Sequence, residues 1–563
     1  MATPASETAL ARLSDGYFTA HYGGNPFAAT IAGVTGLAGL AGVDAEVPDP
    51  SRASDQRRCD RLAALAAELA QLPAGPLGGT DRVTHAMLGR LLADEQATLR
   101  HGLSEVVVSA TMMGALAGVM SVVPTAAVSD PDGAQAYLSR LGKLGGFFDA
   151  LGWRHRQAVT DGRFPTALGV EQALAQLDGY LGMPLERDPL LRPAPGPQVD
   201  ADRWRAQARE LVETVVRPGI VRYRAVLADQ LLPVGRPDGQ VGVCHLPGGT
   251  EGYRAQVRAH TTTELTPDEI HQTGLGLVSQ LREEFAERGG QVLGTGDVPE
   301  VLRRLRSDPQ LRFAGSAEIV ATVDDALRRA EEALPDWFRS YDIAPCVVRE
   351  MDPVEAENSV LGYYQPPAAD GSRPGAHVVN THRPQLRPRF EYETLAFHES
   401  VPGHHLQFAI GQSLTGLPAF RRFAYVTAYG EGWGLYTERL CDEMGLYTSE
   451  LSKLGMVSFD AWRACRLVVD TGMHHLGWSR ERAIAYLHEN TALSETNIAN
   501  EVDRYIAAPG QALAYMIGRL RIRQVRDRMR AAQGAGFDYR EFHHRVLGQG
   551  SVPLDVLDAI LPD

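Results

Sequence analysis

Histidine and glutamate are concentrated in one short segment of the chain, residues 394–407 (TLAFHESVPGHHLQ). His398 and Glu399 stand near its start, and His404 and His405 follow. A zinc peptidase helix commonly contains HExxH, because histidines four residues apart lie on one helical face and the glutamate can act on bound water. Only 17 histidines are spread over the 563 residues, so this density predicts a metal site with hydrolytic chemistry.

The spacing of these histidines differs from HExxH, since His404 follows His398 by six positions and His405 by seven. An undistorted helix would place them about 9 to 10.5 Å apart along its axis, too far for two nitrogens that each bind one zinc at about 2.1 Å. Pro402 and Gly403 change this expectation, because proline removes a backbone donor and glycine accepts unusual dihedral angles. We expect a π-type bulge that makes His404 the second ligand and leaves His405 as neighbour or alternative. The competing interpretation is a capped helix end with surface histidines.

A catalytic zinc usually takes a third protein ligand and keeps one position for water. The candidate is Glu431 in YGEGWGLYTE, which follows His404 by 27 positions and leaves room for a loop and a returning helix. Glu438 lies seven positions further on the same helical face, as a competing ligand or as the partner of a ligand histidine. The simpler alternative is that both carboxylates are solvated helix charges.

Further candidates lie downstream. Arg466, Asp470 and His474 recur every four residues and form one helical stripe. The stripe is either a surface ion-pair ladder of little energetic value or an arrangement in which Asp470 orients His474 toward a developing oxyanion. Tyr505 and Tyr515 flank a helix start, where their hydroxyls either satisfy core hydrogen bonds or polarise a substrate carbonyl.

The elements that must position these residues are mostly helices. Strong helix formers with apolar residues at steps of three and four predict helices over residues 63–72, 134–151, 170–181, 201–231 and 324–334. Thr266, followed by Pro267 and by Glu269, is a strong helix start signal. Turn-rich stretches at residues 190–199, 232–249, 365–375 and 381–388 interrupt the pattern. The first of them predicts a boundary between an N-terminal helical region, residues 1–190, and a catalytic region, residues 200–563.

Strand-like sequence is sparse. Residues 344–349 and 377–380 are expected to form a small antiparallel sheet near the active site, and the second segment to present an edge to an extended peptide. The predicted fold class is therefore mainly α, with a small sheet beside a helical body.

The net charge of the chain limits the kinds of partner that it can bind. The chain has 55 Lys and Arg against 69 Asp and Glu, a formal net charge of −14, which opposes non-specific binding to nucleic acid or to an anionic membrane. Residues 106–123 form an uncharged stretch at the lower length limit for a membrane span. The stretch is weakly hydrophobic and no basic cluster flanks it, so we expect a buried helix.

Five cysteines without a CxxC motif suggest neither a disulfide framework nor a cysteine-built zinc site. The first residues have neither a basic start nor an apolar run of the kind found in signal peptides. Together these features predict a cytoplasmic protein.

Four ordered motifs carry a resemblance to a known family: HESVPGHHLQ, EGWGLYTERL, RLVVDTGMHHLGWSRERAIAYL and YIAAPGQALAYMIGRLRI. They resemble a bacterial family named as domain of unknown function 885, which is similar to the gluzincin zinc peptidases. Residues 249–253, 265–271, 362–364 and 370–375 look like further motifs of this family, and the match spans about residues 249–525. One departure is Met516, where the family pattern leads us to expect lysine.

The resemblance implies a large helical, clamshell-like body that encloses a deep cleft. It also implies zinc ligands at His398, His404 and Glu431, with Glu399 as the general base.

The expected function is that of a zinc-dependent metallopeptidase acting on short peptides, with neither nucleic acid nor membrane as a partner. His474, Tyr505 or Tyr515 would stabilise the oxyanion. The alternative is a non-catalytic metal- or peptide-binding protein with the same fold.

Overall fold

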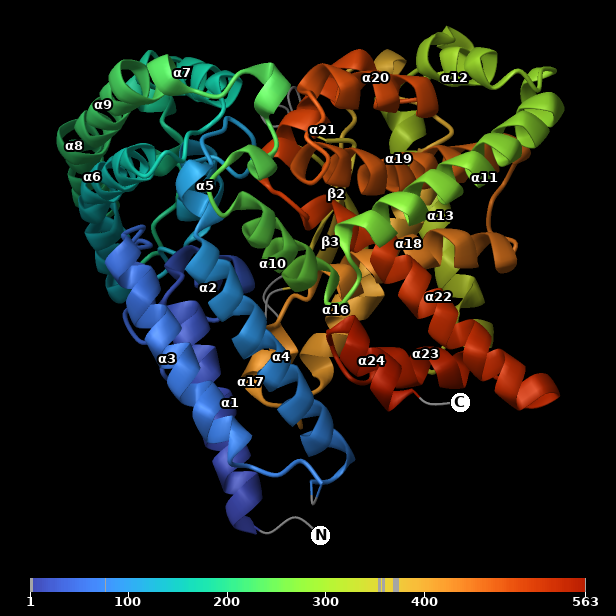
Figure 1. Ribbon diagram of the computed structural model, residues 1–563, viewed down its shortest axis with the longest axis horizontal. Helices are drawn as coiled ribbons and strands as arrows, with labels where there is room; N and C mark the ends of the chain where they lie inside the picture. Colours follow the sequence, from blue (N-terminus) through green and yellow to red (C-terminus); the bar gives the residue numbers. More distant parts are fainter. Residues whose placement is uncertain (1–3, 76, 353–355, 357–359, 368–373, 562–563) are drawn as a thin grey trace. The chain divides into compact units, whose positions relative to one another are not determined.

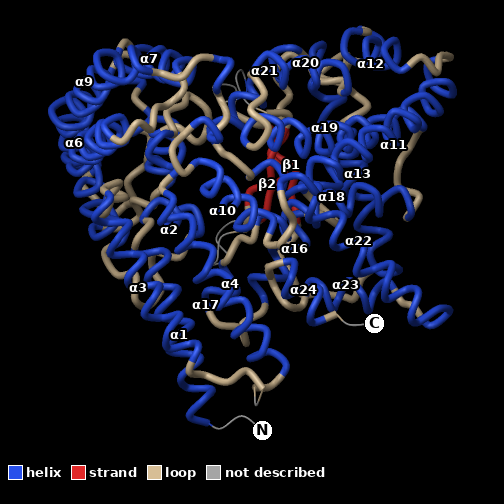
Figure 2. The backbone as a smooth tube through the Cα atoms, in the orientation of Figure 1, coloured by secondary structure: helices blue, strands red, loops and turns tan. Residues whose placement is uncertain are grey.

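The computed structural model describes residues 4–561 except 76, 353–355, 357–359 and 368–373. It is mainly helical, with a few short strands (Figure 2). The chain divides into two compact units. The first unit comprises residues 1–256, 473–481 and 500–509, and the second comprises residues 257–472, 482–499 and 510–563.

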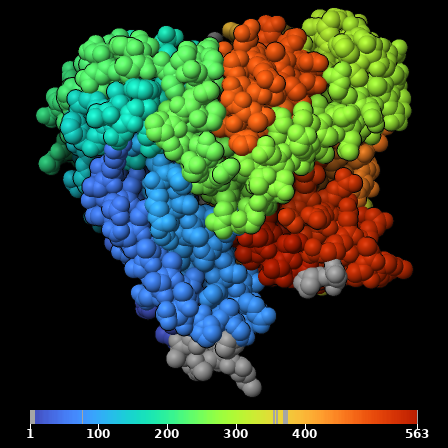
Figure 3. All heavy atoms as spheres, viewed as in Figure 1, coloured from blue at the N-terminus to red at the C-terminus, as the bar shows by residue number. Residues whose placement is uncertain are grey.

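The first unit is built from helices, several of which share an apolar core. Its helices are α1 (Pro4–Gly23), α2 (Pro26–Ala32), α3 (Arg52–Ala70), α4 (Gly79–His101), α5 (Ala115–Val122), α6 (Pro131–Thr160), α7 (Ala167–Leu181), α8 (Ala201–Leu211) and α9 (Arg217–Val226). The long helices α1, α3 and α4 pack side by side (Figure 1) and form the blue part of the face drawn in Figure 3. A Cβ atom on Gly219 would lie 2.5 Å from the Cα atom of Gly145, so α6 and α9 touch through glycine backbone.

The helices expected over residues 63–72, 134–151, 170–181 and 324–334 are confirmed by α3, α6, α7 and α13 (Ser316–Trp337). The segment 201–231 is helical throughout, with π-type turns at Val212–Val216 and Leu227–Leu231. Leu190 is fully buried in the same core as Trp204 and Ile220. Because of this shared core, the stretch 190–199 expected to divide two regions lies inside the first unit.

The helix expected over residues 106–123 is only partly present. Helix α5 covers its second half, and the first half is irregular. The Ser109 hydroxyl accepts a hydrogen bond from the Thr111 backbone N–H at 3.0 Å and bonds the Thr111 hydroxyl at 2.9 Å. Such local bonds give the backbone an alternative to helix. Among the described residues, no helix is long and apolar enough to cross a membrane.

The second unit carries the candidate site. Its helices are α11 (Pro267–Leu293), α12 (Val298–Ser307), α13, α15 (Tyr392–Glu399), α16 (His404–Ser413), α17 (Ala419–Phe423), α18 (Thr427–Glu443), α22 (Ala514–Gln533), α23 (Tyr539–Leu547) and α24 (Leu554–Ile560). Helices with residues in both units are α10 (Gly249–Thr261), α19 (Glu450–His474), α20 (Arg480–Asn490) and α21 (Glu495–Ala507). The helix start expected at Thr266 is confirmed, because Thr266 and Glu269 form a reciprocal capping box at the start of α11.

Helices α18 and α22 cross in direct backbone contact. A Cβ atom on Gly432 would lie 2.5 Å from the Cα atom of Gly518, and one on Gly518 would lie 1.9 Å from the carbonyl oxygen of Ala428. Only glycine permits this approach, and it places α18 in the interior of the unit. Trp433 and Tyr436 of α18 are accordingly buried.

The second unit also holds a sheet of three strands in the order β1-β3-β2. The strands are β1 (Cys346–Glu350), β2 (Gly362–Gln365) and β3 (Gly375–Val379). Strand β1 runs parallel to β3, with Cys346 opposite Gly375, whereas β2 runs antiparallel to β3, with Tyr364 opposite His377.

This topology corrects two expectations. The segments 344–349 and 377–380 pair in parallel, because β2, which the sequence analysis missed, occupies the antiparallel position next to β3. The second segment also offers no free edge, since β3 is the central strand and has a neighbour on both sides. Within the turn-rich stretch 365–375, and within the motif at 370–375, residues 368–373 lie outside the described part of the chain.

All five cysteines are free thiols, in agreement with the absence of a disulfide framework.

Candidate metal centre

His398 and Glu399 lie on one helix, and His404 and His405 lie on the next. Helix α15 ends at Glu399 and α16 begins at His404, so the expected bulge is a full interruption of the helix. One hydrogen bond across it, from the His405 N–H to the Ser400 carbonyl at 3.0 Å, has the five-residue span of a π turn. A Cβ atom on Gly403 would lie 2.0 Å from the carbonyl oxygen of His398, so the turn requires glycine.

The interruption brings the first two predicted ligands together. The rings of His398 and His404 are 4.6 Å apart between centroids, and both are buried. The Nε2 atom of each lies 3.6 Å from Oε2 of Glu431 on α18. In a tetrahedral site with bonds of 2.0 to 2.2 Å, neighbouring ligand atoms are about 3.4 Å apart. The three side chains therefore fit a zinc ion, and their ligand atoms all lie within 4.8 Å of one another.

Helix α18 leaves space for the first ligand at Gly434. A Cβ atom at this position would lie 2.5 Å from Cε1 of His398, well inside van der Waals contact. The imidazole thus packs directly against helix backbone, one turn after Glu431, which lies on the same helix.

Glu438 orients His398. Its Oε1 atom accepts a hydrogen bond from Nδ1 of His398 at 2.8 Å, which leaves Nε2 to face Glu431. A carboxylate behind a ligand histidine fixes the tautomer and ring orientation. Glu438 is fully buried, and Nη2 of the buried Arg463 lies 3.8 Å from the same oxygen. The geometry thus makes Glu431 the candidate ligand and Glu438 the partner of the histidine.

The side chain of His405 points elsewhere. Its Nε2 atom donates to the carbonyl oxygen of Ala344 at 2.9 Å, and its Nδ1 atom accepts from the Tyr364 hydroxyl at 3.2 Å. Adjacent residues of a helix point about 100° apart, so His404 and His405 cannot both face Glu431. The geometry selects His404.

The site strongly favours a positive charge. Burial opposes protonation of His398, but the bonds to Glu431 and Glu438 outweigh it and raise the pKa of His398 to about 10. Burial alone would raise the pKa of Glu431, yet His398 and His404 hold it well below its usual value. A metal cation would supply the charge that a proton supplies here and would displace that proton.

Glu399 follows the first ligand directly in sequence. Burial raises the pKa of the Glu399 carboxyl, and the nearby Glu431 adds to this, against the opposing charges of His398 and His404. A carboxylate that gains proton affinity beside a metal site suits a general base.

The other predicted catalytic residues are divided between the units. Tyr515 belongs to the second unit, where its ring lies 4.3 Å from the Arg466 guanidinium carbon. His474 and Tyr505 belong to the first unit. Nδ1 of His474 accepts from the Val243 N–H at 3.2 Å and Nε2 donates to the Tyr505 carbonyl at 3.0 Å, so neither ring nitrogen remains to donate to an oxyanion. The Tyr505 hydroxyl donates to Oε2 of Glu501 at 2.5 Å.

The structure adds a residue that the sequence analysis missed. The hydroxyl of Tyr425 donates to Oε1 of Glu431 at 2.6 Å, and the Tyr425 ring stacks on Phe408 at a centroid distance of 5.7 Å. Tyr425 precedes α18 and belongs to none of the motifs. Its position six residues before Glu431 is the only signal in the sequence.

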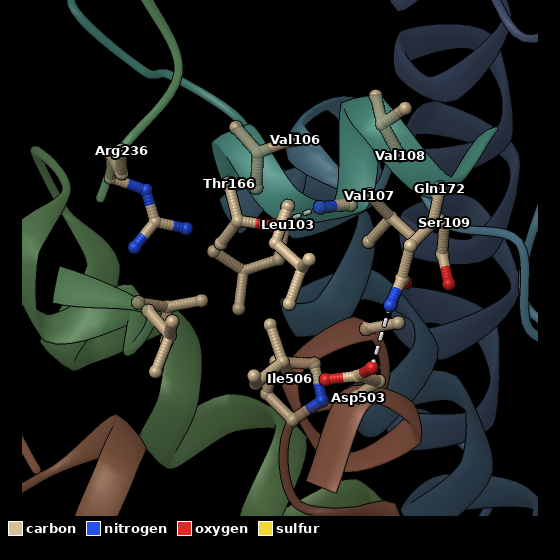
Figure 4. Close-up of a pocket in the computed structure, with 16 residues that line it drawn as sticks. Leu103, Val106, Val107, Val108, Ser109, Thr166, Gln172, Arg236, Asp503 and Ile506 are labelled. Carbon is tan, nitrogen blue, oxygen red and sulfur yellow. Dashed lines mark hydrogen bonds between the residues drawn. The ribbon is translucent and has the colours of Figure 1, made fainter. Parts of the chain in front are cut away.

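The first unit contains a small cavity that differs from the metal centre in its lining. It is lined mostly by apolar side chains, and Gln172 donates to Asp503 at 2.7 Å along one wall (Figure 4). Its volume of about 30 Å³ holds about two water molecules. It contains no residue of the metal centre and is too small for a peptide.

Fold and site define a mainly α-helical protein in which two buried histidines and the partly buried Glu431 form a cluster that could hold a metal ion. The chain belongs to the family described as bacterial protein of unknown function (DUF885), whose model matches residues 26–561. No curated protein matches the chain.

Two solved structures are similar over nearly the whole chain. One, from Colwellia psychrerythraea, is 26% identical, covers 99% of this chain and 98% of its own, and has a TM-score of 0.90. The other, from Shewanella oneidensis, is 17% identical, with coverages of 98% and 99% and a TM-score of 0.76, and so shows the fold alone. Both are described as putative lipoproteins, the second of unknown function.

Proposed function

We propose that the protein is a zinc-dependent metallopeptidase that hydrolyses peptide bonds in short peptides. The observation that carries this proposal is the convergence of two imidazole Nε2 atoms on one oxygen of Glu431, 3.6 Å from each, with Glu399 next to the first histidine. Three protein ligands with an adjacent carboxylate are typical of hydrolytic zinc sites, whereas structural sites use four ligands.

Zinc held by His398, His404 and Glu431 would polarise the scissile carbonyl and lower the pKa of a water molecule. Glu399 accepts the proton of the attacking water and transfers it to the leaving amine. Its raised pKa favours this exchange because the base must both take and return the proton. Tyr515 is the candidate donor to the substrate oxygen.

The test uses purified protein loaded with zinc and a diverse library of short peptides. Wild type is expected to cleave some of them, and Glu399→Gln to retain stoichiometric zinc while losing about 10²- to 10⁴-fold in rate. His398→Ala is expected to lose the metal by elemental analysis. A wild type that holds zinc but cleaves no peptide would support the alternative, a non-catalytic metal- or peptide-binding protein.

The localisation and the partners of the protein are predictions from its sequence. The cytoplasmic expectation came from the sequence, whereas the two similar structures carry the description putative lipoprotein. Cell fractionation of the native protein distinguishes the two. The negative charge of −14 still favours a protein without a nucleic acid partner.

A further inference from the structure

The two oxygens of the Glu431 carboxylate have different neighbours. Oε2 faces both ligand histidines, at 3.6 Å from each Nε2 atom. Oε1 accepts a hydrogen bond of 2.6 Å from the Tyr425 hydroxyl. The hydroxyl is the donor of this bond, because a carboxylate oxygen can only accept.

Tyr425 is 46% exposed, and its ring packs against two helices. A Cβ atom on Gly430 would lie 2.6 Å from Cε2 of the ring, so the ring packs on the backbone of α18 directly before Glu431. The ring also stacks on that of Phe408 of α16, at an interplanar angle of 14°. These ring contacts position the hydroxyl relative to both helices that supply His404 and Glu431.

We propose that Tyr425 is a positioning residue that keeps Glu431 a one-oxygen ligand. A carboxylate whose second oxygen is engaged by a fixed donor does not turn to bind a cation through both oxygens. The coordination position that a second oxygen would occupy therefore stays available to water, as a catalytic zinc site requires. This inference rests on the metal site of the proposed function.

The experiment compares Tyr425→Phe with Tyr429→Phe. The first removes only the hydroxyl that bonds Glu431, and the second removes a buried hydroxyl of α18 that donates to the Val546 carbonyl at 3.0 Å. Zinc affinity is measured by competition with a chromophoric chelator, and the visible spectrum of the cobalt-substituted protein reports the coordination number. Tyr425→Phe is expected to weaken zinc binding about 10- to 100-fold and to change the cobalt spectrum, while Tyr429→Phe matches wild type.

Gly430→Ala is a second variant that retains the hydroxyl but displaces the ring, and it is expected to change affinity and spectrum in the same direction. Wild-type zinc affinity together with an unchanged cobalt spectrum in Tyr425→Phe overturns the inference and leaves the proposed function intact. A wild-type protein that binds neither zinc nor cobalt overturns both.

Discussion

Substitution of Gly434 by alanine tests whether the packing of α18 against His398 builds the metal centre. The added Cβ would lie 2.5 Å from Cε1 of His398, whereas unstrained carbon atoms stay about 3.5 to 4.0 Å apart. The ring or the helix must therefore move by about 1 Å. Metal–ligand distances tolerate only about 0.2 Å, so zinc binding should weaken at least as much as on loss of an orienting partner, about 10- to 100-fold.

Zinc affinity of Gly434→Ala is measured by chelator competition, with the metal-free thermal transition recorded in parallel. Gly276→Ala is the matched control, because Gly276 lies in α11 and an added Cβ there meets nothing within 4 Å. It should bind zinc like wild type and be slightly more stable, since alanine in a helix is favoured over glycine by about 0.5 to 1 kcal/mol. Wild-type zinc affinity in Gly434→Ala would refute the reasoning that this glycine makes room for the ligand ring.

Other perturbations test single contacts. Glu438→Gln removes the charge behind His398 and should weaken zinc binding about 10- to 100-fold, measured by the same competition; equal affinity would contradict an orienting role. His155 and His543 are buried, and burial lowers the pKa of His155 to about 4 and that of His543 to about 3. Because the unfolded chain takes up these protons first, near pH 6.5, the stability that depends on these two histidines being neutral is fully present above that pH and is lost as the pH drops toward 4, by up to about 1.4 kcal/mol per pH unit for each histidine. Denaturant unfolding at pH 7 and pH 5 measures this, and a His155→Gln variant with the same pH slope as wild type would speak against that residue. Thr266→Ala removes the capping box of α11 and should cost about 1 kcal/mol in denaturant unfolding without changing zinc affinity; an unchanged midpoint would show that the cap adds no stability.

The helices and the local signals were predictable because they depend on near neighbours in the chain. Apolar spacing identified α3, α6, α7 and α13, and the capping residues identified the start of α11. The interruption around Pro402 was also predictable, since proline and glycine restrict or free the backbone at their own positions. The local rules failed at residues 107–114, where hydrogen bonds of the Ser109 and Thr111 side chains replace helix.

The amino-acid sequence by itself determined the set of candidate ligands. Histidines and glutamates are so concentrated in two short motifs that a metal site is the chemistry they predict. Only the tertiary structure decided which members of that set meet. His404 rather than His405 faces Glu431 because the two side chains leave α16 in different directions, and Glu438 rather than Glu431 lies behind His398 because of how α18 packs on α15. The parallel pairing of β1 with β3 and the bond from Tyr425 to Glu431 likewise depend on segments that sequence spacing does not relate. Distances between such segments are set by core packing over the whole unit, which no local pattern encodes.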